Sequence, residues 1–276
     1  YALALGLQPE NVYFHSFIWV GKESAYLEGI IPNSIGDLDH LEYLSLSNNK
    51  LSGSVPEAIS NLQLLKGLDL RNNQLTSLDI SNNISLTELD CNHNQLTSLD
   101  ISNQSSLTNL ICAYNLLTVI DLSSCISLTN LDCGANNLSV LDVSNNIFLI
   151  ELFTSANNIS GLDLSNNYVL DYLKSTNNPL MSLNLGNNTA LTSLVLQSSN
   201  LISIDLSNNS NLIHFVIRNH NQLSSLDLRN GNNANMSTSS SNLDFTGNPQ
   251  LYCIDVDSAA YSTANWTVAN GNINYW

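Results

Sequence analysis

The chain repeats itself with a fixed period, and this feature constrains its fold more than any other. Leucines recur every 21 residues, and they open stretches of the form LxxLx(L/C/I/F)xxN. They are Leu65, Leu86, Leu107, Leu128, Leu149, Leu170, Leu191 and Leu212. One repeat of this length cannot bury its apolar side chains alone, so neighbouring repeats must stack them into a continuous core. The sequence therefore predicts a solenoid.

Two kinds of repeat follow one another. Residues 27–40 (LEGIIPNSIGDLDH) and 51–64 (LSGSVPEAISNLQL) precede the 21-residue repeats that begin at Leu65. With these motifs the sequence resembles the leucine-rich-repeat superfamily over about residues 24–228. The first repeats resemble the 24-residue plant type, and the 21-residue repeats are similar to those of secreted bacterial surface proteins. The resemblance implies an extracellular protein, either secreted or held at the cell surface.

The expected fold is an α/β-type solenoid that is mostly β and irregular. It is a curved, right-handed leucine-rich-repeat solenoid with a parallel β-sheet on the concave face and short extended or turn segments on the convex face. The first half of each repeat should form the sheet, because it stays in phase from Leu41 through Leu65 while the second half changes. The expected parts are an N-terminal cap (1–26), plant-type repeats (27–64), 21-residue repeats (65–229), and a polar insertion with a C-terminal cap (230–276).

Asparagines recur at the end of each expected strand, where an amide can satisfy backbone groups of the turn with both donor and acceptor. They are Asn49, Asn73, Asn94, Asn115, Asn136, Asn157 and Asn178. Ser199 and His220 replace them in the last two repeats, so the hydrogen-bond ladder is expected to loosen there.

A row of aspartates occupies one position of the convex side in five successive repeats, at Asp79, Asp100, Asp121, Asp142 and Asp163. Stacked copies lie about 5 Å apart, where two unit charges repel by roughly 0.8 kcal/mol even in water. Each carboxylate is expected to accept hydrogen bonds from the following turn. The alternative is a row of calcium ions bridging neighbouring carboxylates. We favour the structural interpretation and expect no cofactor.

Five cysteines are present, and three of them share the third apolar position of successive strands. Cys91, Cys112 and Cys133 are therefore expected to be buried, unreactive thiols rather than metal ligands. Cys125 replaces a convex-turn asparagine and is expected to be partly buried. Cys253 lies outside the repeats.

Composition and motifs exclude several classes of function. Seven basic against 23 acidic residues give a net charge of −16, which opposes nucleic-acid binding. The longest apolar run, residues 12–20, is far shorter than the roughly 20 residues that span a bilayer, so no membrane insertion is expected. No catalytic motif is present, and the histidines are scattered, so the chain is not expected to be an enzyme.

The variable outward positions of the concave strands are the best candidates for a binding site, because exposed apolar groups gathered on one surface mark interaction sites. The predicted ligand-binding residues are Ile111, Tyr114, Glu151, Phe153, Tyr172, Lys174, Val195, His214, Val216 and Arg218. The predicted function is a monomeric, non-catalytic binding module for a protein or a glycan. The alternatives are a structural or adhesive spacer of a larger cell-surface protein, and a binder of ice or crystalline polysaccharide.

Overall fold

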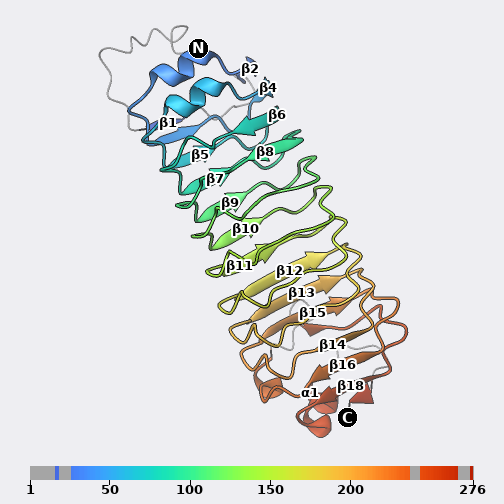
Figure 1. Ribbon diagram of the computed structural model, residues 1–276. Helices are drawn as coiled ribbons and strands as arrows, with labels where there is room; N and C mark the ends of the chain where they lie inside the picture. Colours follow the sequence, from blue (N-terminus) through green and yellow to red (C-terminus); the bar gives the residue numbers. More distant parts are fainter. Residues whose placement is uncertain (1–15, 19–25, 237–242, 267–273, 276) are drawn as a thin grey trace. The chain divides into compact units, whose positions relative to one another are not determined.

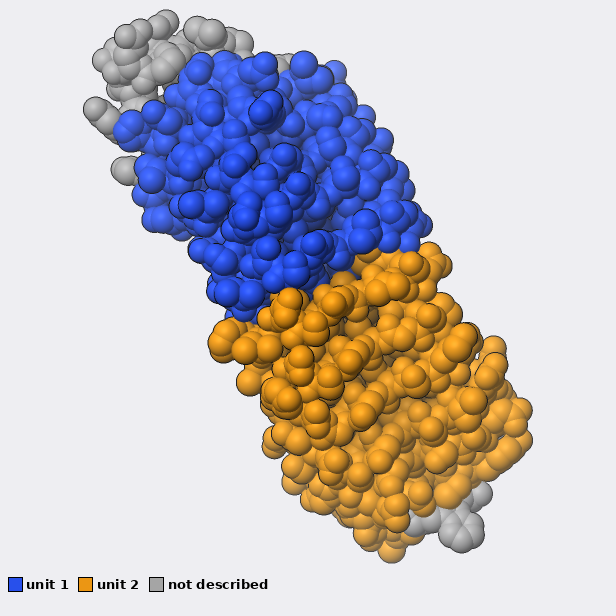
Figure 2. All heavy atoms as spheres, in the orientation of Figure 1, with its two compact units in different colours: residues 1–137 blue, residues 138–276 orange. Residues whose placement is uncertain are grey.

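The computed structural model describes residues 16–18, 26–236, 243–266 and 274–275. The chain divides into two compact units, residues 1–137 (unit 1) and 138–276 (unit 2), which Figure 2 colours separately. Most of the expected N-terminal cap, residues 1–26, lies outside the described residues, as do residues 237–242 of the polar insertion.

Unit 1 contains two parallel sheets (Figure 1). The main sheet runs in the order β1 (Ser16–Ile18), β3 (Tyr43–Ser45), β5 (Gly67–Asp69), β7 (Glu88–Asp90), β9 (Asn109–Ile111) and β10 (Asn130–Asp132). The second sheet runs in the order β2 (Glu28–Gly29), β4 (Lys50–Ser54), β6 (Gln74–Asp79) and β8 (Ser98–Asp100). Two 3₁₀ helices, η2 (Asn33–Asp37) and η3 (Glu57–Asn61), follow prolines in the plant-type repeats.

Unit 2 repeats this arrangement. Its main sheet contains β11 (Glu151–Phe153), β12 (Tyr172–Thr176), β13 (Ser193–Gln197), β15 (His214–Arg218) and β17 (Leu243–Asp244). Its second sheet contains β14 (Ser203–Asp205), β16 (Ser225–Leu228), β18 (Cys253–Val256) and β19 (Asn274–Tyr275). The 3₁₀ helix η4 (Asn233–Asn235) precedes the α-helix α1 (Ala259–Asn265).

The prediction of which half-repeat forms the main sheet is confirmed. Strand pairs in both units join residues one repeat apart, such as Leu89 with Leu110 and Leu173 with Leu194. The second half of each repeat forms short strands in some repeats and turns alone in others, because its backbone is interrupted by the Asn-rich turn.

The core lies between the two sides of each repeat. One repeat contributes six apolar side chains that are at most 2% exposed: Leu65, Leu68, Leu70, Leu75, Leu78 and Ile80. Full burial of such a side chain contributes about 1.5–3 kcal/mol relative to exposure, so stacked repeats stabilise one another strongly. Near the C-terminal end of unit 2, Trp266 is 1% exposed, and its ring centroid lies 6.1 Å from that of Phe245.

The asparagine ladder is confirmed in its structural role, and Asn115 shows the pattern. Its Nδ2 donates to the carbonyl oxygens of Cys91 and Cys112 at 3.0 Å, and its Oδ1 accepts from the Leu96 N–H at 2.9 Å. Each side chain thus ties two neighbouring repeats together and satisfies buried backbone groups that would otherwise be costly.

In unit 2 the hydrogen-bond ladder continues with serine and histidine side chains in place of asparagine. Ser199 Oγ lies 2.8 Å from His220 Nδ1, and His220 Nε2 lies 3.3 Å from the Leu196 carbonyl oxygen. The Ser199 N–H donates to His220 Nδ1 at 3.3 Å, and the Leu201 N–H donates to Ser199 Oγ at 3.4 Å. The imidazole therefore keeps one carbonyl contact of the amide pattern, the one with Leu196, and Asn248 restores the amide pattern after it.

Candidate functional site

Unit 2 presents most of the predicted ligand-binding residues on the outward face of its main sheet. The strand register places them in two columns. The central column reads Phe153, Lys174, Val195, Val216 and Asp244, and the flanking column reads Glu151, Tyr172, Ser193 and His214. We call these side chains, together with Arg218, the unit 2 face.

An aromatic pair forms the apolar part of the unit 2 face. The rings of Phe153 and Tyr172 make an edge contact, with centroids 5.0 Å apart and planes at 75°. Both side chains are half-buried and come from adjacent strands, β11 and β12. Because they point away from the Leu core, their packing is not needed to hold the repeats together, and they offer rigid apolar area to a ligand.

The two basic side chains of the unit 2 face, Arg218 and Lys174, differ in whether they already have a partner. Arg218 is held in place, since its Nε donates to Gln197 at 3.0 Å and its Nη1 lies 3.3 Å from Asp244. Lys174 is exposed and forms no ion pair with any residue that the structure describes. Its ammonium group is therefore the cation of the unit 2 face that can still pair with a ligand.

Two predicted site residues do not have the expected surroundings. Val216 is 8% exposed, because it lies on β15 between Val195 of β13 and Asp244 of β17, and it adds little to the outer surface. Tyr114 does not lie on a strand: it follows β9 in a turn with φ +54 and stacks on His93, with ring centroids 4.1 Å apart. Strand alternation makes Ala113 the next outward position after Ile111, so Tyr114 belongs to the turn that follows β9.

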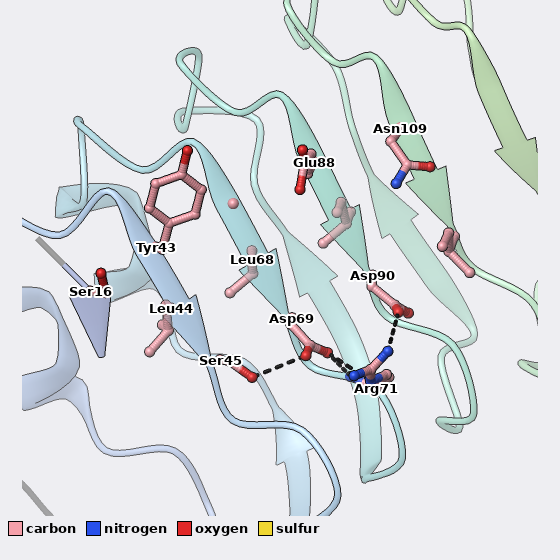
Figure 3. Close-up of a pocket in the computed structure, with 13 residues that line it drawn as sticks. Ser16, Tyr43, Leu44, Ser45, Leu68, Asp69, Arg71, Glu88, Asp90 and Asn109 are labelled. Atoms are coloured by element: carbon pink, nitrogen blue, oxygen red, sulfur yellow. Dashed lines mark hydrogen bonds and ion pairs between the residues drawn. The ribbon is translucent and has the colours of Figure 1, made fainter. Parts of the chain in front are cut away.

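Unit 1 presents different chemistry on its main sheet. A hollow of about 480 Å³ lies over β3, β5 and β7 (Figure 3). Its outward polar residues are Ser45, Asp69, Arg71, Glu88, Asp90 and Asn109. Ile111 lines its end, so the structure places this predicted residue in unit 1, apart from the unit 2 face. Sequence reasoning missed the hollow, although Gly67 beside Tyr43 was a usable signal of missing side-chain volume.

Electrostatics in this hollow depend on one arginine. Arg71 lies 3.6 Å from a carboxylate oxygen of Asp69 and 3.6 Å from one of Asp90. Burial raises the pKa of Asp90, while the N–H of Asn92 opposes the shift, and the neighbouring carboxylate of Asp69 adds to it. The hollow is therefore a polar site in which acceptors outnumber donors.

The convex aspartate row has the predicted turn hydrogen bonds. Asp79, Asp121 and Asp163 each accept from a serine N–H two residues on, at 2.9 Å, and Asp100 and Asp142 do the same at 2.9–3.0 Å. Asn184 takes the same role in unit 2 without a charge. Among the described residues no three His, Cys, Asp or Glu side chains are grouped as metal ligands.

The cysteines occupy the core, as predicted for three of them. Cys91, Cys112 and Cys133 are fully buried, and burial raises the pKa of each thiol, that of Cys133 to about 12. Cys125 is also fully buried, which corrects the expectation of partial exposure, and burial raises its pKa to about 11. It fills the place of the turn asparagine, a position that the neighbouring repeats enclose.

Comparison with known proteins identifies the repeat. Residues 23–75 match the sequence model of the leucine-rich-repeat family, and no curated protein sequence matches the chain. The functional domain of InlJ from Listeria monocytogenes, which includes a cysteine ladder, is 25% identical with a TM-score of 0.56. The match covers 87% of this chain and 63% of that one, so this chain spans less than two thirds of the Listeria protein's length.

Two further structures share the fold at lower identity. The ectodomain of the plant receptor kinase GASSHO1/SCHENGEN3 from Arabidopsis thaliana, in complex with CASPARIAN STRIP INTEGRITY FACTOR 2, is 21% identical with a TM-score of 0.64, covering 94% of this chain and 36% of that one. A leucine-rich-repeat protein from Leptospira interrogans is 19% identical with a TM-score of 0.52, covering 90% and 81%. The chain therefore folds as a solenoid of the leucine-rich-repeat type. No helix within its described residues is long and apolar enough to cross a membrane.

Proposed function

We propose that this leucine-rich-repeat solenoid is a non-catalytic binding module, and that the unit 2 face binds a protein ligand. The observation that carries the proposal is the Phe153–Tyr172 pair beside Lys174, because an aromatic anchor next to an unpaired charge is typical of interface hot spots. These side chains are not part of the leucine core, and the equivalent positions of the other repeats carry different residue types.

The chemistry of the unit 2 face indicates which kind of ligand it suits. The aromatic pair favours an apolar side chain, and Lys174 favours a carboxylate close to it. A protein segment carries both groups within a few residues, so it can satisfy the two contacts at once. The plant receptor kinase GASSHO1/SCHENGEN3, which shares the fold, has been solved in complex with CASPARIAN STRIP INTEGRITY FACTOR 2, and this supports the proposal by analogy of fold only.

The sequence resemblance adds that the module acts outside the cell, secreted or at the cell surface. The alternative of a structural or adhesive spacer has no specific contact in its favour. A spacer would not need an aromatic pair and an unpaired lysine at adjacent variable positions.

The test is capture of a protein ligand from a host or neighbour-cell lysate, followed by measurement of its dissociation constant. The double variant Phe153→Ala/Tyr172→Ala should weaken binding by about 1 kcal/mol or more, the threshold for a hot spot. The matched control is Met181→Ala/Ile202→Ala, which removes two exposed apolar side chains from the other side of unit 2. If the double variant binds normally and the control loses binding, the site lies on the side of Met181 and Ile202 and the proposal is wrong.

A further inference from the structure

The hollow of unit 1 has the size and the polar lining of a small-ligand site. Its volume of about 480 Å³ falls inside the range of roughly 300–1,000 Å³ that small-ligand sites occupy. It lies on β3, β5 and β7, whose backbones are held by parallel strand pairing, so the hollow is preformed.

Gly67 makes the floor of this hollow. The register places Tyr43, Gly67 and Glu88 side by side on three neighbouring strands. A Cβ on Gly67 would lie 2.7 Å from Tyr43 Cδ1, closer than real Cβ contacts allow, and 3.1 Å from Cε1, which is also tight. The tyrosine ring therefore leans over the glycine, and with 46% of the residue exposed it offers an apolar surface at the edge of the hollow.

The polar groups beside the ring retain hydrogen-bonding capacity. The 3.6 Å contacts of Arg71 with Asp69 and Asp90 are longer than N–H···O hydrogen bonds, which lie near 2.9 Å. Figure 3 shows Arg71 between the two carboxylates, with the Ser45 hydroxyl donating to Asp69 at 3.0 Å. Glu88 forms no ion pair with any described residue. The hollow thus offers a guanidinium donor and three carboxylate acceptors.

These charged groups determine which ligand charge the hollow can accept. Three carboxylates against one guanidinium oppose an anion. A cation would have to displace Arg71, which already lies between Asp69 and Asp90. A neutral group with several hydroxyls faces neither cost, because each hydroxyl can accept from Arg71 and donate to a carboxylate.

We propose that the unit 1 hollow binds a neutral sugar residue of a glycan. One face of the sugar ring packs on Tyr43, and its hydroxyls bridge Arg71 to the carboxylates of Asp69 and Asp90. Gly67 keeps the space above β5 open for the ring.

The test is an NMR titration of the full chain with three neutral probes: methyl β-D-glucopyranoside, methyl α-D-mannopyranoside and methyl β-D-galactopyranoside. Arginine amide and N-acetylneuraminic acid serve as the charged comparators. At least one neutral glycoside should shift the backbone amide signals around Gly67, Asp69 and Asp90. The charged comparators should leave those signals unchanged.

Two variants and a matched control locate the site. Tyr43→Ala removes the ring, and Gly67→Ala pushes it away, so each should weaken glycoside binding by about tenfold, or about 1.4 kcal/mol. Gly161→Ala makes the same substitution where a Cβ meets nothing within 4 Å, and it should bind normally. The proposal is overturned if no glycoside binds at tens of millimolar, if arginine amide binds in its place, or if all three variants bind alike. These results are independent of the unit 2 face.

Discussion

In unit 1 the central outward column of the main sheet reads Ser45, Asp69, Asp90, Ile111 and Asp132, whereas in unit 2 it reads Phe153, Lys174, Val195, Val216 and Asp244. Both units stack their repeats on a leucine core, and these two columns differ in the side chains that they place on the outward face of the main sheet. Unit 1 carries 14 acidic and four basic residues, and unit 2 carries nine and three. A stacked repeat can therefore present two chemistries on one scaffold without altering what stabilises it.

The two units also differ in what their buried positions contain. Unit 1 holds four cysteines inside its core, while unit 2 holds one, Cys253, which is half-exposed. Unit 1 keeps asparagine throughout its ladder, while unit 2 has Ser199 and His220 between Asn178 and Asn248. The predictions below use these differences, from the largest expected effect to the smallest.

Thiol reactivity should separate the units most strongly. In the native protein at pH 8, Cys253 should label with a maleimide or a disulfide reagent at least about a thousandfold faster than Cys91, Cys112 and Cys133, because those thiols are buried and their pKa values are raised. Mass spectrometry of timed samples gives each rate. Rapid labelling of the three ladder cysteines would show that they do not lie in the core.

Removal of a ladder side chain should cost more in unit 1 than in the altered part of unit 2. Asn115→Leu leaves the Leu96 N–H and the Cys91 and Cys112 carbonyls without this partner, so the free energy of unfolding should fall by about 3 kcal/mol or more. Ser199→Ala removes the contact of Ser199 Oγ with His220 Nδ1 and a single long bond from the Leu201 N–H, and it should cost about 1 kcal/mol. Urea unfolding measures both, and equal losses would contradict the distinction.

Acid should destabilise unit 2 through His220. Burial lowers the pKa of this imidazole below its ordinary value, so the unfolded chain takes up the proton at a higher pH than the folded chain does. The stabilising contribution is present above the unfolded pKa of about 6.5 and is lost as the pH falls from there through the folded pKa. His220→Asn should remove this pH dependence between pH 7 and 5, as followed by thermal unfolding. An unchanged pH profile in that variant would assign the acid sensitivity to other groups.

The smallest expected effect is that of calcium. If the aspartate row is structural, millimolar calcium or excess chelator should not change the melting temperature, because the carboxylates are already bonded to turn N–H groups. Hydrogen bonds from Ser102 lower the pKa of Asp100, and those from Ser165 lower that of Asp163, which keeps both ionised without a cation. A calcium-dependent rise of several degrees would make Asp79, Asp100, Asp121, Asp142 and Asp163 metal ligands by mass action.

Periodicity alone determined most of the fold. A leucine every 21 residues leaves stacking as the only way to bury the apolar face, and the half-repeat that stays in phase in both repeat types identified the main sheet. The buried asparagines and cysteines followed from the same counting, since a position that repeats in sequence repeats in space. Cys125 was misjudged because a turn position looks exposed in the sequence, while its burial depends on the repeats on either side.

Only the tertiary structure decided which variable residues meet. The sequence placed Phe153 and Tyr172 on one face, but their edge contact depends on strand register and side-chain rotamers. It also suggested Tyr114 and Val216, which the turn and β17 remove from the exposed strand surface. The unit 1 hollow was not predicted, because a cavity is made by what Gly67 lacks and by where Tyr43 leans, and a repeat pattern records neither.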